Sequence, residues 1–386
     1  MGGGIQLIDL AQAFETFEAS KDGTVGIEEE LALLDPETLE LVPAFERLRD
    51  AADDHPVLVG ALAGELISSE LELVSGKGSD TADARRRQHE RRAALFAHAL
   101  EHGVALGATG THPLSDYRDQ HIIETEHYRR VEEGLQYVAR RNNTFSLHVH
   151  VGIQGADRAV RVCDRLRPVL PTLLAISANS PYVDGRDSGL HSARTQTFTK
   201  SFPRCGIPDV HGSWRAWAEY VDLLVRTGSI VEFTQLWWSV RPHHTFGTVE
   251  VRICDVQGTG PESDALSELI AACVGQAARE VDAGETPPDL PGRVIEENVW
   301  RAVRFGLDGR LLDLENVSGG PIVEYDAAEA IERLSAWCGA SVDLPQHNGA
   351  QRQRQAIAAG ATPFEVYAET VEETRSTYSV KEPVHE

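Results

Sequence analysis

The stretch FSLHVHV, residues 145–151, alternates apolar and polar side chains along its whole length. Successive side chains of a β-strand point to opposite faces, so this alternation predicts a strand with one apolar face. His148 and His150 then lie together on the polar face. Two histidines at this spacing can place an imidazole on a metal ion, while a pair of satisfied core or surface histidines is the alternative.

A second stretch, TVGIEEEL at residues 24–31, places Glu28 and Glu30 on one face of a predicted strand. Carboxylates about 7 Å apart along a strand repel each other in a low-dielectric site unless a cation lies between them. A hard divalent ion prefers oxygen ligands, so Mg²⁺ is the expected ion, and a solvated edge strand is the alternative. Glu29 lies on the apolar face or at its rim, and we expect a structural role for it.

A third stretch, TVEVRICD at residues 248–255, puts Glu250 and Arg252 on one strand face. This pair is either a plain ion pair between strands or a metal ligand beside a guanidinium that binds phosphate. Strict alternation also places Cys254 on the polar face, where the chemistry requires no thiol.

The segment ELISSELELV, residues 65–74, adds further acids. Glu70 and Glu72 share a strand face, but Glu65 is seven residues before Glu72, and an odd offset puts the two on opposite faces of a straight strand. Both reach one site only if Ser68-Ser69 makes a bulge or a turn, as we expect.

Taken together, the strands predict a sheet whose polar face carries acids, imidazoles and a guanidinium, which indicates a concave site that binds cations. Other segments have the period of helices, and short strands mixed with long helices predict an α+β fold with helices on one face of a sheet. We expect one domain over residues 1–386, with a loop at residues 284–292 (GETPPDLPG). The predicted helices span residues 81–102, 124–141, 157–178, 214–226, 262–281, 293–305, 327–337 and 363–376.

The formal net charge of −24 excludes a protein that binds bare nucleic acid, because phosphate contacts require basic surface. No apolar run is long enough to span a membrane. The N-terminus has no charged region followed by an apolar one, and the five cysteines are scattered without a CxxC pair. These observations predict reduced thiols and a cytoplasmic location.

Several motifs, in this order, resemble the glutamate–cysteine ligase type 2 family, also described as carboxylate–amine ligases. They are GIEEE at residues 26–30, the acids Glu65 and Glu72, HVH at 148–150, TVEVRICD at 248–255, ENVWRAVRFGLDG at 297–309 and NGAQRQR at 348–354. The resemblance extends through most of the chain. It implies a glutamine-synthetase-like catalytic fold, in which a curved antiparallel sheet forms a funnel with helices packed on its outer face.

The resemblance also implies roles for individual residues. Arg252 would meet the γ-phosphate of ATP, and Arg252, Glu250 and His150 would be catalytic. His150 would lie beside the substrate, and which of the two histidines binds metal stays open. Arg194 and Arg241 would contact substrate, with a surface arginine and a polar loop as the alternatives, and Asn298 and Arg301 would support the nucleotide or simply pack a helix. The implied metal ligands are Glu28, Glu30, Glu65, Glu72, His148 and Glu250.

The implied reaction joins glutamate to cysteine with ATP and two or three Mg²⁺ ions, through a γ-glutamyl phosphate. Clustered Mg²⁺ and an arginine suffice for phosphoryl transfer without a protein nucleophile. A ligase for another amine and a non-catalytic metal-binding relative are the alternatives. The oligomeric state is open, and a homo-oligomer is compatible with the sequence.

The cationic side chains are unusually poor in lysine. Only Lys21, Lys77, Lys200 and Lys381 accompany the arginines among 36 basic residues. An acidic, lysine-poor surface suits a cytoplasm with molar salt, where screening removes self-repulsion, and with the resemblance this indicates a haloarchaeal source. An ordinary acidic protein with a high-GC codon bias is the alternative.

If the charge is an adaptation to salt, the melting temperature rises between low salt and molar KCl, because screening relieves repulsion among the surface acids. Thermal melts followed by circular dichroism over a KCl series measure this. A melting temperature that gains nothing from salt contradicts the hypothesis.

Overall fold

A computed structural model describes residues 9–230, 232–285, 290–314 and 322–379. Its centre is an open, entirely antiparallel sheet of seven strands. The strands run in the order β2 (Leu62–Ala63), β3 (Glu70–Val74), β1 (Val25–Leu34), β5 (Ser146–Gly152), β9 (Thr248–Asp255) and β8 (Val240–His243), and β4 (Ala105–Gly107) also pairs with β1. Two small hairpins, β6 (Tyr182–Val183) with β7 (Arg186–Asp187) and β10 (Arg310–Leu312) with β11 (Glu324–Asp326), lie apart from it.

Each of the eight predicted helical segments contains a helix. The segment 157–178 is divided by a 3₁₀ turn over Arg167–Val169, and the segment 124–141 is divided at Gln136, which has a φ of 50°. Proline residues interrupt the segment 157–178, because a proline ring fixes φ and the residue has no backbone N–H to donate. These helices are α3 (Thr81–Glu101), α4 (Glu126–Leu135), α5 (Tyr137–Arg140), α6 (Ala156–Leu166), α7 (Leu170–Ser177), α9 (Trp214–Arg226), α10 (Gly260–Asp282), α11 (Gly292–Phe305), α12 (Ala327–Cys338) and α14 (Pro363–Tyr378).

Four further helices were not predicted: α1 (Leu10–Glu18), α2 (Phe45–Ala51), α8 (Ala193–Ser201) and α13 (Gly349–Ala358). The α13 helix illustrates the reason. Its mean composition is polar, but Asn348 and Gln351 form a reciprocal capping box at its start. In the expected loop 284–292, residues 286–289 lie outside the described residues.

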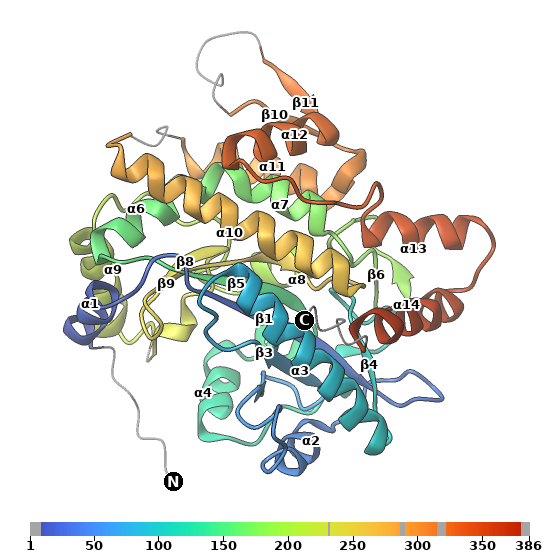
Figure 1. Cartoon of the computed structure of the whole chain (residues 1–386). Helices are drawn as coiled ribbons and strands as arrows, with labels where there is room; N and C mark the ends of the chain where they lie inside the picture. The colour runs from blue at the N-terminus through green and yellow to red at the C-terminus, as the bar shows by residue number, and fades with distance from the viewer. Residues whose placement is uncertain (1–8, 231, 286–289, 315–321, 380–386) are drawn as a thin grey trace, which may run out of the picture.

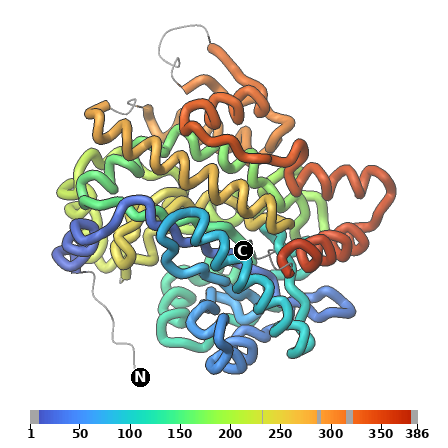
Figure 2. Tube along the Cα trace, in the orientation of Figure 1, coloured from blue at the N-terminus to red at the C-terminus, as the bar shows by residue number. Residues whose placement is uncertain are grey.

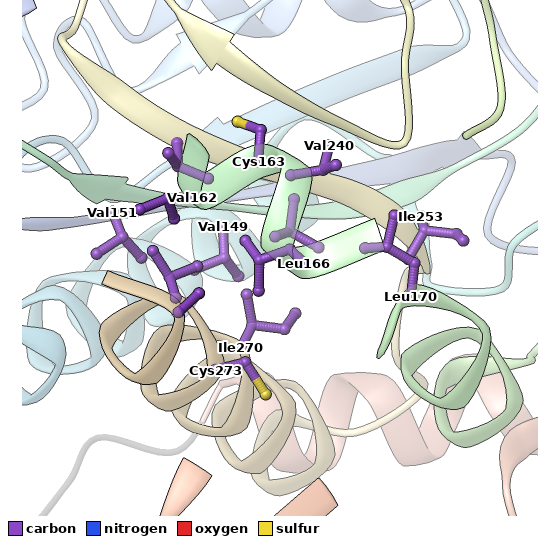
Figure 3. Close-up of a cluster of buried hydrophobic side chains, with 14 of the residues drawn as sticks. Val149, Val151, Val162, Cys163, Leu166, Leu170, Val240, Ile253, Ile270 and Cys273 are labelled. Carbon is purple, nitrogen blue, oxygen red and sulfur yellow. The ribbon is translucent and has the colours of Figure 1, made fainter. Parts of the chain in front are cut away.

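Long helices cover the apolar face of the sheet, as Figure 1 shows for α3 and α10. Helices α6, α7 and α10 pack on β5, β8 and β9, and the valines of the strands meet their leucines in one core. Figure 3 shows Val149, Val240 and Ile253 beside Leu166 and Leu170. The α+β prediction is therefore confirmed, and none of the five cysteines, all of them in the described residues, forms a disulfide.

The C-terminal helices lie beside the N-terminal part of the sheet, as the red and blue-cyan segments of Figure 2 show. Helix α14 packs against β4 and α3, where Tyr367 and Val371 enter a second core with Leu34 and Phe96. This end of the sheet is thus closed by residues that are far apart in the sequence.

The strand pairing sets the polar side chains in rows. Glu28 lies opposite His148, Glu30 opposite Glu72, and Glu250 lies between His150 and Arg241. Directly opposed residues in an antiparallel pair project to the same face. The polar residues of the separate strands therefore share one face, as predicted.

A β-bulge corrects one expectation. Between Leu147 and Val149, β9 contributes an extra residue, so that Leu147 lies opposite Cys254 while Val149 lies opposite Val251. The extra residue reverses the alternation, and Cys254 is buried in the apolar core instead of on the polar face.

The predicted turn at Ser68-Ser69 is present. The Glu70 amide donates to the Ile67 carbonyl at 3.1 Å, and β3 begins at Glu70. Glu65 therefore does not belong to the same straight strand as Glu72, and the odd spacing no longer separates the two.

Glu29 is the centre of a buried charge network behind the sheet. Its side chain is 0% exposed and that of Arg92 is 1% exposed. Arg92 donates from Nη2 to Glu29 Oε1 at 2.6 Å, from Nε to Oε2 at 2.8 Å and from Nη1 to Asp264 at 2.9 Å. Ser263 and Tyr378 also donate to Glu29, so the network joins β1 to α3, α10 and α14. Burial opposes ionisation of Glu29, but Arg92 outweighs it and lowers the pKa of Glu29.

Replacing Arg92 by Met should destabilise the fold by about 3–5 kcal/mol, because it leaves a buried carboxylate without its cation. Urea unfolding followed by fluorescence measures the loss. Arg87→Met on the same helix is the matched control, since Arg87 is 42% exposed and pairs with Asp83 at 3.0 Å, for which about 0.5 kcal/mol is expected. Equal losses in the two variants contradict this account.

Candidate active site

The polar face of the sheet forms the floor of a cavity of about 340 Å³. Helices α4 and α8 and the loop before β8 form its walls. The floor and acidic wall contain Glu28, Glu30, Glu65, Glu70, Glu72, His148 and Glu250, and the remaining lining includes Arg194, Arg241, Arg252, Asn142, Thr144, Tyr128, Trp237 and Phe246.

Glu28, His148 and Glu250 come from β1, β5 and β9 and form the first candidate metal group. Each offers one ligand atom, and these atoms lie within 4.8 Å of one another. His148 Nδ1 is 3.4 Å from Glu28 Oε2, so its imidazole is held between the strands.

Glu30, Glu72 and His148 form a second candidate group within the same 4.8 Å limit. The Ser146 amide donates to Glu30, and the other imidazole nitrogen of His148, Nε2, is 2.7 Å from Ser146 Oγ and 3.7 Å from Glu30 Oε1. His148 is thus common to both groups, while His150 belongs to neither of these two among the described residues.

These donor sets fit hard divalent cations. Each group supplies two carboxylates and one imidazole, and Mg²⁺ takes a few such ligands and completes its shell with water or substrate oxygens. Glu65 belongs to neither group but lines the same cavity. All six predicted ligands therefore line the cavity, and five of them belong to the two groups. Their role as metal ligands stays a prediction.

The carboxylates differ in how the protein compensates them. Burial opposes ionisation of Glu250, but Arg241 and Arg252 hold its pKa well below the usual range. Burial also opposes ionisation of Glu28, but the charge of His150 outweighs burial and lowers the pKa of Glu28. On the other side of the cavity, burial and the charge of Glu30 raise the pKa of Glu65 to about 8, and burial and Glu28 raise that of Glu72. That acidic side is the part that a bound cation would stabilise.

Arg241 and Arg252 flank Glu250. Arg241 donates from Nε to Glu250 Oε2 at 2.6 Å and from Nη1 to the Leu236 carbonyl at 2.6 Å. Arg252 also donates to Glu250, and its Nη1 is 3.4 Å from His148 Nδ1. The buried Arg252 Nε has no hydrogen-bond partner within the part of the chain that the structure describes, so the guanidinium retains capacity for an anion.

His150 lies behind the first metal group. Its Nε2 is 3.1 Å from Glu28 Oε1 and its Nδ1 is 3.0 Å from Thr248 Oγ1. Burial would lower the pKa of His150, but the charges of Glu28 and Glu250 raise it. The ring is not part of the cavity lining and contacts His243 and Phe246 edge-on, so it supports Glu28 and Glu250 from behind.

Arg194 reaches the cavity from the first turn of α8. Ser192 caps that helix and donates to the buried Asp255 at 2.8 Å, which fixes the start of α8 against β9. The Arg194 guanidinium donates to the carbonyls of Ile253 and Arg252 at 3.1 and 3.2 Å. Sequence reasoning placed Arg194 at the substrate, and the structure brings it to the cavity wall.

Asn298 and Arg301 do not line this cavity. Both are on α11, where Asn298 exchanges two hydrogen bonds with the backbone of Leu312, and Arg301 contacts Glu297 and Glu324. The packing alternative describes these contacts, and a nucleotide contact for either residue stays a prediction.

Several lining residues were not assigned to the site from the sequence, and Trp237 was expected in the core. Tyr128 donates to the Gly64 carbonyl and so joins α4 to the Glu65 loop. Trp237 lines the cavity, whereas Trp214, Trp217 and Trp238 are in the core. Glu70 received no role from the sequence, although its alternation with Glu72 placed it on the polar face, and it lines the cavity.

The comparisons with known proteins agree with this geometry. The family model of glutamate–cysteine ligase family 2 (GCS2) matches residues 24–371. A Rubrobacter xylanophilus protein provisionally named glutamate–cysteine ligase 2-2 is 40% identical over 331 residues, 86% of this chain and 83% of that protein. A Sorangium cellulosum protein provisionally named glutamate–cysteine ligase 2 is 39% identical over 86% of this chain and 90% of its own.

Two solved structures share the fold at low sequence identity. A glutamate–cysteine ligase from Francisella tularensis, in complex with AMP, has a TM-score of 0.66 at 11% identity and covers 95% of this chain and 91% of that one. A bifunctional glutathione synthetase from Pasteurella multocida has a TM-score of 0.66 at 13% identity and covers 95% of this chain, which spans 54% of that protein. The predicted glutamine-synthetase-like fold is thereby confirmed.

The fold, the family match and the relatives define a carboxylate–amine ligase of the glutamate–cysteine ligase type. The chain belongs to glutamate–cysteine ligase family 2. In the described ranges, no helix is both long and apolar enough to cross a membrane.

Because His148 belongs to both candidate metal groups, its replacement tests them. His148→Gln should weaken the binding of Mn²⁺, used in place of Mg²⁺, by at least about tenfold, since a ligand of both groups is lost. Free Mn²⁺ measured by electron paramagnetic resonance gives the affinity. His150→Gln is the matched change, and a smaller loss is expected because His150 supports the ligands without joining a group. Equal weakening by both variants contradicts the assignment.

Proposed function

We propose that this protein is an ATP- and Mg²⁺-dependent glutamate–cysteine ligase that forms γ-glutamylcysteine through a γ-glutamyl phosphate. The observation that carries the proposal is the pair of carboxylate–imidazole groups that share His148 beside the free edge of Arg252. This arrangement combines positions for divalent cations with a guanidinium that can bind a phosphate, and the family supplies the reaction class.

The proposed chemistry requires positioning and charge neutralisation more than a protein nucleophile. The γ-carboxylate of glutamate attacks the terminal phosphorus of ATP and ADP leaves; the amine then attacks the acyl carbon and releases phosphate. Glu28, His148 and Glu250 would hold one Mg²⁺ and Glu30, Glu72 and His148 another, with Glu65 beside them. When bound, the ions neutralise phosphate charge. The sequence contains no P-loop motif, which is consistent with this way of binding phosphate.

Arg252 is the residue assigned to the transferring phosphoryl group. Glu250 neutralises it on one edge and orients it, and burial favours strong interactions with developing charge. Arg252 lines the cavity, and its Nε has no hydrogen-bond partner among the described residues. Arg241, in contrast, makes two hydrogen bonds to Glu250 and two to the backbone carbonyls of Thr234 and Leu236, so its first effect is to fix Glu250.

The identity of the amine is the finer part of the proposal. The names of the relatives favour cysteine. The metal groups by themselves would serve a ligase for another amine equally well. A haloarchaeal source, a cytoplasmic location and a single domain remain predictions from the sequence, which leaves the oligomeric state open.

The proposal is tested by ADP release from ATP with Mg²⁺ and glutamate, in a KCl series up to the molar range. Turnover should depend on cysteine, and mass spectrometry should detect γ-glutamylcysteine. Other amino acids and simple amines at equal concentration are the control acceptors. Turnover with one of them but not with cysteine identifies a different carboxylate–amine ligase, and bound metal without ADP release under any acceptor refutes catalysis.

A further inference from the structure

Glu70 is a buried carboxylate to which the proposed reaction assigns no role. It begins β3, lies opposite Ala32 of β1 and lines the cavity. Glu70 is only 1% exposed, and its Oε2 has no hydrogen-bond partner among the residues that the structure describes. A buried charge or polar atom left without a partner is costly, so a ligand group that supplies the partner would bind tightly there.

The geometry does not favour a third metal group at Glu70. The two groups found in the described residues use Glu30, Glu72 and His148 on this side, and Glu70 joins neither of them. Hard cations require several oxygen or nitrogen atoms converging on one point. The missing partner of Glu70 is therefore better supplied by a donor carried on a small molecule.

Arg194 provides a complementary feature. Burial and the charges of Glu30, Glu65 and Glu72 raise the pKa of Glu70, and the charge of Arg194 opposes this effect. The Arg194 side chain lines the same cavity. Both terminal nitrogens of Arg194 donate to backbone carbonyls. The residue is 6% exposed, and its Nε has no hydrogen-bond partner in the described part of the chain. One acceptor and one donor, both buried and both without partners, thus belong to one cavity.

We propose that Glu70 binds the α-ammonium group of the amino acid whose carboxylate is activated, while the Nε edge of Arg194 faces its α-carboxylate. An α-amino acid carries these two opposite charges on one carbon, which matches an acid and a guanidinium in a shared wall. The inference rests on the proposed function, because it takes glutamate as the activated substrate, and it makes Glu70 a determinant of specificity for an amino acid over a plain dicarboxylic acid.

The chemistry of the two ends of the substrate supports this orientation. The α-carbon would lie between Glu70 and Arg194, and the side-chain carboxylate would extend toward His148 and Arg252, where the phosphoryl group is transferred. The ammonium of the activated substrate does not react, so a carboxylate that holds it interferes with no step. For the acceptor amine, a carboxylate would instead have to release the nitrogen as a neutral nucleophile.

The test compares L-glutamate with glutarate, which has the same carboxylates at the ends of the chain but no ammonium. The wild-type protein should prefer glutamate, and Glu70→Gln should lower the ratio of the two kcat/KM values by at least about tenfold, because a charge-assisted hydrogen bond to the ammonium is lost. Glu70→Asp retains the charge and should restore part of the preference. The KM for ATP should change little in either variant.

Calorimetric binding of the two acids, with Mg²⁺ and a non-hydrolysable ATP analogue, gives the same comparison without turnover. The Gln variant removes an uncompensated buried acid, so its melting temperature should equal or exceed that of the wild type. Retained discrimination in Glu70→Gln, or an effect confined to the KM of the acceptor, overturns the inference while the ligase activity stands. Normal discrimination in binding without any ADP release refutes the proposed function and leaves the Glu70 site supported.

Discussion

The central constraint on this structure is the electrostatic repulsion among carboxylates that are gathered on one buried face. Glu28, Glu30, Glu72 and Glu250 are brought together by antiparallel pairing, and at such distances carboxylates tolerate each other only when cations face them. Arg241, Arg252 and His150 provide this on the β9 side. In the part of the chain that the structure describes, no arginine forms an ion pair with Glu65, Glu70 or Glu72 on the β3 side, where the pKa values of these acids are raised. This difference divides the cavity into an internally compensated half and a half suited to ligands.

The same strand that carries the acids is anchored from behind. Glu28 and Glu30 project into the cavity, while Glu29 between them is bound by Arg92 in the core. The network reaches α10 through Asp264 and α14 through Tyr378, so the position of β1 depends on elements from both ends of the chain. A buried ion pair does not make the fold more stable than an apolar contact of the same shape would, but each partner requires the other. Rigid placement of the two neighbouring carboxylates is the functional consequence.

Much of this architecture follows from local patterns. Period-two alternation identified β1, β5 and β9 and their polar faces, and period-3.6 patterns located the long helices, because side-chain direction is a local property of each element. Where a local rule failed, the cause was a contact with another strand or a cap: the bulge in β9 moved Cys254 into the core, and the capping box at Asn348 formed a helix whose composition is polar. The location of Asn298 and Arg301 away from the cavity was equally beyond local reasoning.

The sequence by itself determined which residues face the same side of each strand, and so the chemical character of the site. Only the tertiary structure decided how the strands are ordered and in what register, and therefore that His148 and not His150 joins both metal groups. It also placed Glu70 and Arg194 in one cavity without partners for their free atoms. The physical reason is that alternation is fixed within a strand, whereas register, bulges and the approach of α8 arise from packing between segments that are far apart in the sequence.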